Sequence, residues 1–142
     1  MTKVRPFHLA IPVDNLEICR KFYNEVLKCD EGRSSEHWVD FDFFGHQLVL
    51  HERSDVEEIQ KKVYNPVDGQ EVPVPHFGVV MDWDVWHDFK DMIISQNIEF
   101  VIEPYIRFEG LPGEQATMFF LDPEENALEF KAFKNIDQLF SK

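Results

Sequence analysis

Two short stretches of sequence, FHLAIPV at residues 7–13 and HFGVVM at residues 76–81, share one alternating pattern and decide the fold. In each, large apolar residues alternate with a histidine and smaller residues, which is typical of a β-strand with two different faces. The large apolar residues, Phe7 among them, are expected to pack against a helix. His8 and His76 are then expected on the opposite face, each at an equivalent position of its strand.

A helix is expected after each of these strands. Asp14 can begin the first helix, and Glu17 three residues later completes a capping-box pattern. Asp82 or Asp84 can cap the second helix, which is expected to run to Asn97. Apolar residues recur at helical spacing in both segments, so each helix has one face suited to packing on a sheet.

Three further strands are expected after each helix, because short apolar or alternating segments are separated there by turn residues. These strands are expected at residues 31–36, 38–44, 46–52, 99–108, 116–121 and 127–133. After the last strand, residues 136–140 are expected to form a short helix.

The order of strand, helix and three strands therefore occurs twice, and such a duplication is the main organisational signal in the chain. We expect one domain over residues 1–142, with a first module at 6–53 and a second at 75–134. A linker at 54–74 and a C-terminal tail or short helix at 135–142 complete it. The predicted class is α+β, in which the two βαβββ modules form a curved eight-stranded mixed sheet around a central metal cavity.

The overall charge narrows the range of partners. The chain has 27 acidic and 14 basic residues and a net charge of −13, which repels nucleic acid and anionic membrane surfaces. The segment MTKVRPFHLAIPV lacks the apolar core of a secretory signal, and Cys19 and Cys29 do not form a disulfide framework. We expect a cytoplasmic protein that acts on a small molecule, with no nucleic-acid or membrane partner.

Glu129 interrupts an otherwise apolar strand, ALEFKAF at residues 127–133. Burial of a lone carboxylate costs several kcal/mol unless the group is paired or binds a metal. If Glu129 faces the cavity, it converges with His8 and His76. Two imidazoles and a carboxylate suit an octahedral divalent ion that keeps open positions for substrate or water. Each residue alone is more often structural, but their equivalent placement in a duplicated unit favours a metal site.

Further candidate site residues share the cavity face of the first module. Internal alignment of the repeats sets Val49 opposite Glu129, and by alternation Gln47 and His51 lie on the same face as Val49. We expect Gln47 to contact substrate and His51 to act as an acid or base, since histidine can transfer a proton near neutral pH. The alternative for His51 is an exposed strand end.

The connection at residues 103–114 contains two glycines and can cover the open side of a site. Tyr105 is a candidate donor to an oxyanion, and Arg107 is a candidate ligand for a substrate carboxylate. A structural or solvated role is the alternative for both. Lys131 follows Glu129 on the same face and is expected to be its charge partner.

The motifs LEICRKFYNEVL at residues 16–27 and FFLDPEENALEFKAF at 119–133, with the two histidine strands, resemble the vicinal oxygen chelate superfamily. This superfamily includes glyoxalase I, extradiol dioxygenases, fosfomycin-resistance transferases, methylmalonyl-CoA epimerase and bleomycin-binding proteins. The resemblance implies a metal held by His8, His76 and Glu129 and chelated by vicinal oxygens of the substrate. Glyoxalase I and the epimerases typically have a fourth protein ligand, and Val49 at that position counts against a glyoxalase I activity.

Three function classes follow from the resemblance. The first is an enzyme similar to extradiol dioxygenases, with Fe²⁺ as the favoured metal and Mn²⁺, Ni²⁺ or Zn²⁺ as alternatives. The second is a glyoxalase-like lyase or isomerase, or a thiol transferase, that uses a non-redox metal. The third is a non-catalytic binding protein of the bleomycin type. The resemblance is also compatible with a homodimer.

Overall fold

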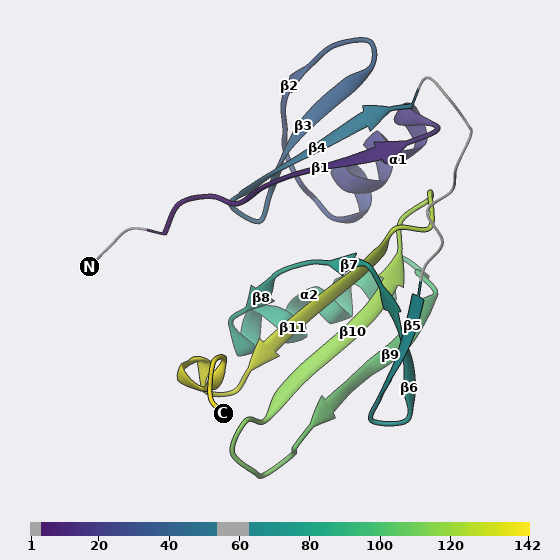
Figure 1. The fold of residues 1–142 in the computed structure, drawn as a ribbon. Helices are drawn as coiled ribbons and strands as arrows, with labels where there is room; N and C mark the ends of the chain where they lie inside the picture. Colours follow the sequence, from purple (N-terminus) through teal and green to yellow (C-terminus); the bar gives the residue numbers. More distant parts are fainter. Residues whose placement is uncertain (1–3, 54–62) are drawn as a thin grey trace. The chain divides into compact units, whose positions relative to one another are not determined.

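The computed structural model describes residues 4–53 and 63–142, and the chain divides into two compact units, Met1–Gln60 and Lys61–Lys142 (Figure 1). Each unit is described by itself. Both combine helix with β-sheet, so the predicted α+β class is confirmed. Within the described residues no helix is long and apolar enough to cross a membrane. Cys19 and Cys29 are both buried, and no disulfide joins them.

The first unit contains the predicted order of strand, helix and three strands. Its sheet has the order β1-β4-β3-β2, in which β1 and β4 are parallel and the other neighbours antiparallel. The helical segment begins as an α-helix and continues as a π-helix. The elements are β1 (His8–Val13), α1 (Leu16–Lys21), the π-helix η1 (Phe22–Val26), β2 (Glu31–Ser34), β3 (Trp38–Phe43) and β4 (His46–Glu52).

The second unit repeats this order after an additional hairpin. Its main sheet has the order β7-β11-β10-β9, and β8 also pairs with β11. The elements are β5 (Val63–Val67), β6 (Gln70–Val74), β7 (His76–Phe77), β8 (Val80–Met81), α2 (Trp83–Ser95), β9 (Phe100–Arg107), β10 (Gln115–Leu121), β11 (Ala127–Phe133) and the 3-10 helix η2 (Ile136–Gln138).

The pairing registers of the two units correspond. His8 pairs with Gln47 in the parallel pair β1–β4, and His76 pairs with Ala127 in the parallel pair β7–β11. Two residues further along, Val49 in β4 therefore stands at the position that Glu129 occupies in β11. The internal alignment made from the sequence is confirmed.

The first helix begins one residue later than the sequence predicts. Asn15, not Asp14, is the N-cap, since its extended backbone lets its side chain accept a hydrogen bond from the N–H of Ile18. The carboxylate of Asp14 instead accepts from Nε of Arg53 at 2.9 Å. Asp82 caps α2 as predicted, although without a side-chain hydrogen bond.

The expected alternation in the first strand is confirmed, with one exception. Leu9, Ile11 and Val13 are more buried than the residues between them. Phe7 is 65% exposed, so the prediction that it packs against the helix is wrong. It lies one residue before β1, where its backbone N–H donates to Nδ1 of His46 at 2.8 Å.

Residues 63–74, which the sequence assigns to a linker, form the β5–β6 hairpin; the residues before it in that segment lie outside the described part of the chain. Asp68 and Gly69 both have positive φ (51° and 76°), the conformation of a tight hairpin turn. Val72 of the hairpin packs in an apolar cluster with Ile102 and Phe119 of the main sheet. The hairpin is therefore a packed part of the second unit.

The second histidine strand is interrupted, because its backbone approaches β11 very closely at Gly78. A Cβ atom on Gly78 would lie 1.6 Å from the carbonyl oxygen of Glu129. The predicted continuous strand at 76–81 is consequently two short strands, β7 and β8. The glycine is needed for this approach.

We predict that Gly78→Ala destabilises the protein by about 1–3 kcal/mol, because the strand must move away from Glu129 to relieve the clash. Urea unfolding of the metal-free protein measures the loss. Gly32→Ala in β2 is the matched control, since its Cβ would meet its nearest atom at 3.4 Å. Equal stability of the two variants would contradict the packing role of Gly78.

Candidate metal centre

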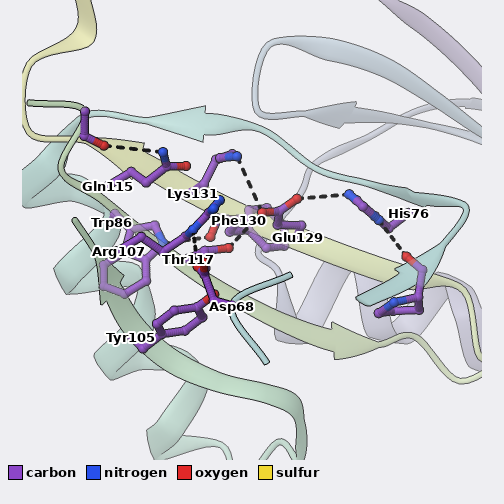
Figure 2. A network of polar contacts seen from close by, with 12 residues as sticks. Asp68, His76, Trp86, Tyr105, Arg107, Gln115, Thr117, Glu129, Phe130 and Lys131 are labelled. Carbon is purple, nitrogen blue, oxygen red and sulfur yellow. Dashed lines mark hydrogen bonds and ion pairs between the residues drawn. The ribbon is translucent and has the colours of Figure 1, made fainter. Parts of the chain in front are cut away.

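His76 and Glu129 meet on one face of the second sheet (Figure 2). Because His76 pairs with Ala127 in parallel strands, Glu129 lies two residues further along the neighbouring strand and on the same face. Nε2 of His76 is 3.0 Å from Oε2 of Glu129. The structure thus brings together two of the three predicted metal ligands.

The carboxylate of Glu129 is largely enclosed, with its side chain 15% exposed. Thr117 on β10 donates its hydroxyl hydrogen to Oε1 at 2.8 Å, and Nζ of Lys131 lies 3.7 Å from the same oxygen. Burial raises the pKa of Glu129, but the hydrogen bond with His76 and the charge of Lys131 outweigh it and leave the pKa lowered. Glu129 is therefore held as a carboxylate, with Oε2 directed to His76.

His76 is held from its other side by the backbone. Its Nδ1 lies 2.7 Å from the carbonyl oxygen of Pro73, which can only accept, so Nδ1 carries a hydrogen and donates it. The hydrogen bond to Glu129 raises the pKa of His76 against the opposing effect of burial. A histidine that ligates a metal through Nε2 commonly donates its Nδ1–H to a backbone carbonyl, as His76 does to Pro73.

The third predicted ligand, His8, lies in the first unit on β1. Its Nδ1 is 2.8 Å from Oε1 of Gln47, and Nε2 of Gln47 donates to Oδ2 of Asp40 at 3.1 Å. Gln47, expected to contact substrate, thus contacts His8. Within either unit, the described residues contain no group of three His, Cys, Asp or Glu side chains placed to hold a metal.

Tyr105, the predicted oxyanion donor, and Arg107, the predicted ligand for a substrate carboxylate, lie on β9. Both interact with Asp68 at the tip of the β5–β6 hairpin (Figure 2). The hydroxyl of Tyr105 donates to Oδ2 at 3.2 Å, and Arg107 forms an ion pair with the same oxygen. Burial, and then Asp68, raise the pKa of Tyr105. Sequence reasoning did not identify this contact.

His51, the predicted acid or base, lies exposed near the end of β4 with Trp38 and Pro12 as its strand partners. It is on the same face as Gln47, two residues beyond Val49. In the described part of the first unit, the hydrogen-bonded chain of His8, Gln47 and Asp40 does not include it.

Thr117, by contrast, was missed by sequence reasoning, because a strand threonine carries no signal until its cross-strand neighbour is known.

Solved structures of known proteins share this arrangement of strands and helices along nearly the whole chain. The glyoxalase/bleomycin resistance protein/dioxygenase from Alicyclobacillus acidocaldarius is 31% identical, with a TM-score of 0.77 over 95% of this chain and 96% of that protein. The chain belongs to this family. It is therefore a member of the vicinal oxygen chelate superfamily, as the sequence motifs predict.

More distant structures show the same fold. The fosfomycin resistance protein FosX from Listeria monocytogenes is 16% identical with a TM-score of 0.66, over 97% of this chain and 98% of that one. The virulence protein STM3117 from Salmonella typhimurium is 22% identical with a TM-score of 0.63, over 94% and 99%. At these identities the likeness concerns the fold alone. No protein-family model and no curated protein sequence matches the chain.

The donor atoms in the second unit fit the divalent metal that is common in the superfamily. Oε2 of Glu129 and Nε2 of His76 face one another, while Oε1 and Nδ1 are held by Thr117 and Pro73. A metal held by Oε2 and Nε2 would replace the proton that these two atoms share, and the hydrogen bonds of Oε1 and Nδ1 would remain. The chemistry of the pair is thus compatible with metal ligation.

We predict that Thr117→Val destabilises the metal-free protein by about 1–3 kcal/mol, because it leaves Oε1 of Glu129 buried without its hydroxyl donor. Thr117→Ser, which keeps the hydroxyl, is the matched control and should lose less. Urea unfolding in the presence of a chelator measures both. A valine variant as stable as the serine variant would show that this hydrogen bond does not support the carboxylate.

Proposed function

We propose that the chain is a divalent-metal-dependent enzyme in which His8, His76 and Glu129 hold one metal ion. Vicinal oxygens of a small substrate would complete the coordination. The observation that carries this proposal is the pair of His76 and Glu129, in which Nε2 faces Oε2. Nδ1 of His76 is already bound to Pro73, and Oε1 of Glu129 is already bound to Thr117. Fe²⁺ is the favoured metal, and Mn²⁺, Ni²⁺ and Zn²⁺ are the alternatives.

The proposed reaction class resembles that of the extradiol dioxygenases. Val49, which is 5% exposed, stands where a fourth protein ligand would be, and valine cannot ligate. Two histidines and one carboxylate leave open positions on the metal, an arrangement used by oxygen-activating iron enzymes. When bound, Fe²⁺ would supply activation of dioxygen and polarisation of the substrate oxygens.

The side chains around the pair are suited to a substrate that carries negative charge. Lys131 provides a cation on the same face as Glu129, and Tyr105 and Arg107 provide further donors once Asp68 is displaced. The ring of Phe119 meets the ring of His76 edge to face at 5.1 Å and offers an apolar wall. We assign to His51 the transfer of a proton between substrate and solvent.

A second candidate function is Lewis-acid catalysis by a lyase, isomerase or thiol transferase. The cation of Lys131 close to Glu129 favours it, because anionic adducts are typical substrates of such enzymes. Val49 still counts against the four-ligand site of glyoxalase I. A binding protein without catalysis is the outcome that remains if no metal binds. The net charge of −13 continues to disfavour nucleic acid as a partner.

We predict near-stoichiometric divalent metal in protein purified without chelators, and its loss in Glu129→Ala. Elemental analysis measures the content. Glu103→Ala, an exposed glutamate on β9 of the same sheet, is the matched control and should keep the metal. A metal-free wild type would contradict the proposed function.

Because metal binding needs a neutral imidazole and the pKa of His76 is raised, the affinity for the metal should increase as pH rises through that raised pKa.

We predict that protein loaded anaerobically with Fe²⁺ cleaves at least one ring in a panel of catechols when oxygen is admitted. Oxygen consumption and the absorbance of the ring-opened product measure the reaction, and the Zn²⁺-loaded protein is the control. Turnover of a methylglyoxal–glutathione adduct without oxygen by the Mn²⁺, Ni²⁺ or Zn²⁺ form would instead support Lewis-acid catalysis. Metal binding with neither reaction would contradict both assignments of substrate.

A further inference from the structure

A chain of two hydrogen bonds crosses three neighbouring strands of the first sheet. It joins Asp40 on β3, Gln47 on β4 and His8 on β1, which are neighbouring strands in the order β1-β4-β3. His8 and Gln47 are direct cross-strand partners, which places both side chains on one face. Oε1 of Gln47 is 2.8 Å from Nδ1 of His8, and Nε2 of Gln47 is 3.1 Å from Oδ2 of Asp40.

The carboxylate at one end of this chain fixes its direction. The oxygen and nitrogen of a glutamine amide have similar shapes, so their assignment has to come from their partners. A carboxylate only accepts hydrogen bonds, so the NH₂ group of Gln47 must face Asp40, and its carbonyl oxygen must face His8. Because that carbonyl oxygen also only accepts, Nδ1 of His8 has to carry a hydrogen.

We propose that Gln47, oriented by Asp40, is a positioning residue that holds His8 with Nε2 free to bind the metal. This inference rests on the proposed function and gives Gln47 a role other than the substrate contact expected from the sequence. A histidine that ligates a metal commonly donates its other ring N–H to a fixed acceptor, which sets both the tautomer and the ring orientation. Gln47 is that acceptor for His8.

The second unit achieves the same result by different means. By strand register the counterpart of Gln47 is Ala127, which has no hydrogen-bonding side chain. There the carbonyl oxygen of Pro73, at the end of the β5–β6 hairpin, accepts from Nδ1 of His76 at 2.7 Å. Both histidines therefore present Nε2, although one is held by a side chain and the other by the backbone.

His8 depends on this support more than His76 does. His8 is exposed, whereas His76 is half-buried against Phe119. Without Gln47 the imidazole of His8 would be free to rotate and to carry its hydrogen on Nε2, which would block ligation by that atom. Loss of Gln47 should therefore weaken metal binding with little effect on folding.

The decisive experiment measures the His8 tautomer and the affinity for Mn²⁺ in the full chain. In the metal-free wild type, ¹⁵N NMR of the imidazoles should show the hydrogen of His8 on Nδ1. Calorimetric titration should show that Gln47→Leu binds Mn²⁺ about 10- to 100-fold more weakly, the range typical for loss of a ligand's outer partner. Gln70→Leu, an exposed glutamine on the β5–β6 hairpin, is the matched control and should bind as the wild type does.

A double variant tests the direction of the hydrogen bonds that join Asp40, Gln47 and His8. Gln47→Glu alone places two carboxylates together and should disturb the site, but Asp40→Asn with Gln47→Glu restores a donor facing an acceptor. The carboxylate of that double variant can still accept from Nδ1 of His8, so most of the Mn²⁺ affinity should return. A double variant as weak as Gln47→Leu would contradict the proposed polarity, because the rescue depends on it.

The outcomes separate this inference from the proposed function. A wild type that binds no Mn²⁺, Fe²⁺, Ni²⁺ or Zn²⁺ would contradict the proposed function and the metal role of Gln47 together. A wild type that binds Mn²⁺ while Gln47→Leu binds it equally well would overturn only the role of Gln47. A hydrogen on Nε2 of His8 in the metal-free wild type would also overturn it.

Discussion

The carboxylate of Glu129 has to be compensated, because its side chain is only 15% exposed. Thr117 and Lys131 interact with one of its oxygens, and His76 faces the other. Removal of a carboxylate from water costs several kcal/mol, so these partners determine which oxygen is available for chemistry. The proposed metal site follows from the different roles of the two oxygens. Oε1 is bound by Thr117 and Lys131, whereas Oε2 faces His76, the other proposed metal ligand of this unit.

The duplicated units have the same strand register but different chemistry. Val49 in the first unit and Glu129 in the second occupy equivalent positions, so at this position the second unit has a carboxylate and the first has an apolar side chain. The contacts between strands differ in the same way. Ala10 pairs with Val49 across β1 and β4, whereas at the equivalent Gly78 a Cβ atom would collide with the backbone of β11. A common fold therefore supports an asymmetric set of donors.

The β5–β6 hairpin frames the polar face of the second sheet. Asp68 at its tip is bound by Tyr105 and Arg107, and Pro73 near its end orients His76. The hairpin thus links the donors proposed for the substrate to a ligand proposed for the metal. Because Asp68 neutralises Arg107, an anionic substrate would have to compete with it, and this competition is a physical basis for selectivity.

Alternation and helical spacing in the sequence determined the order of strand, helix and three strands in each unit, because this order depends on period and repetition within the chain. The same patterns determined the faces of the histidine strands and the equivalence of Val49 with Glu129, but they did not predict the β5–β6 hairpin. Asn15 as the helix cap and the exposure of Phe7 depend on local competition for hydrogen bonds and on where strand pairing begins. Only the tertiary structure decided the partners of the site residues. The bonds from Thr117 to Glu129 and from Asp40 through Gln47 to His8 join distant segments, and no local pattern encodes which side chains become neighbours across a sheet.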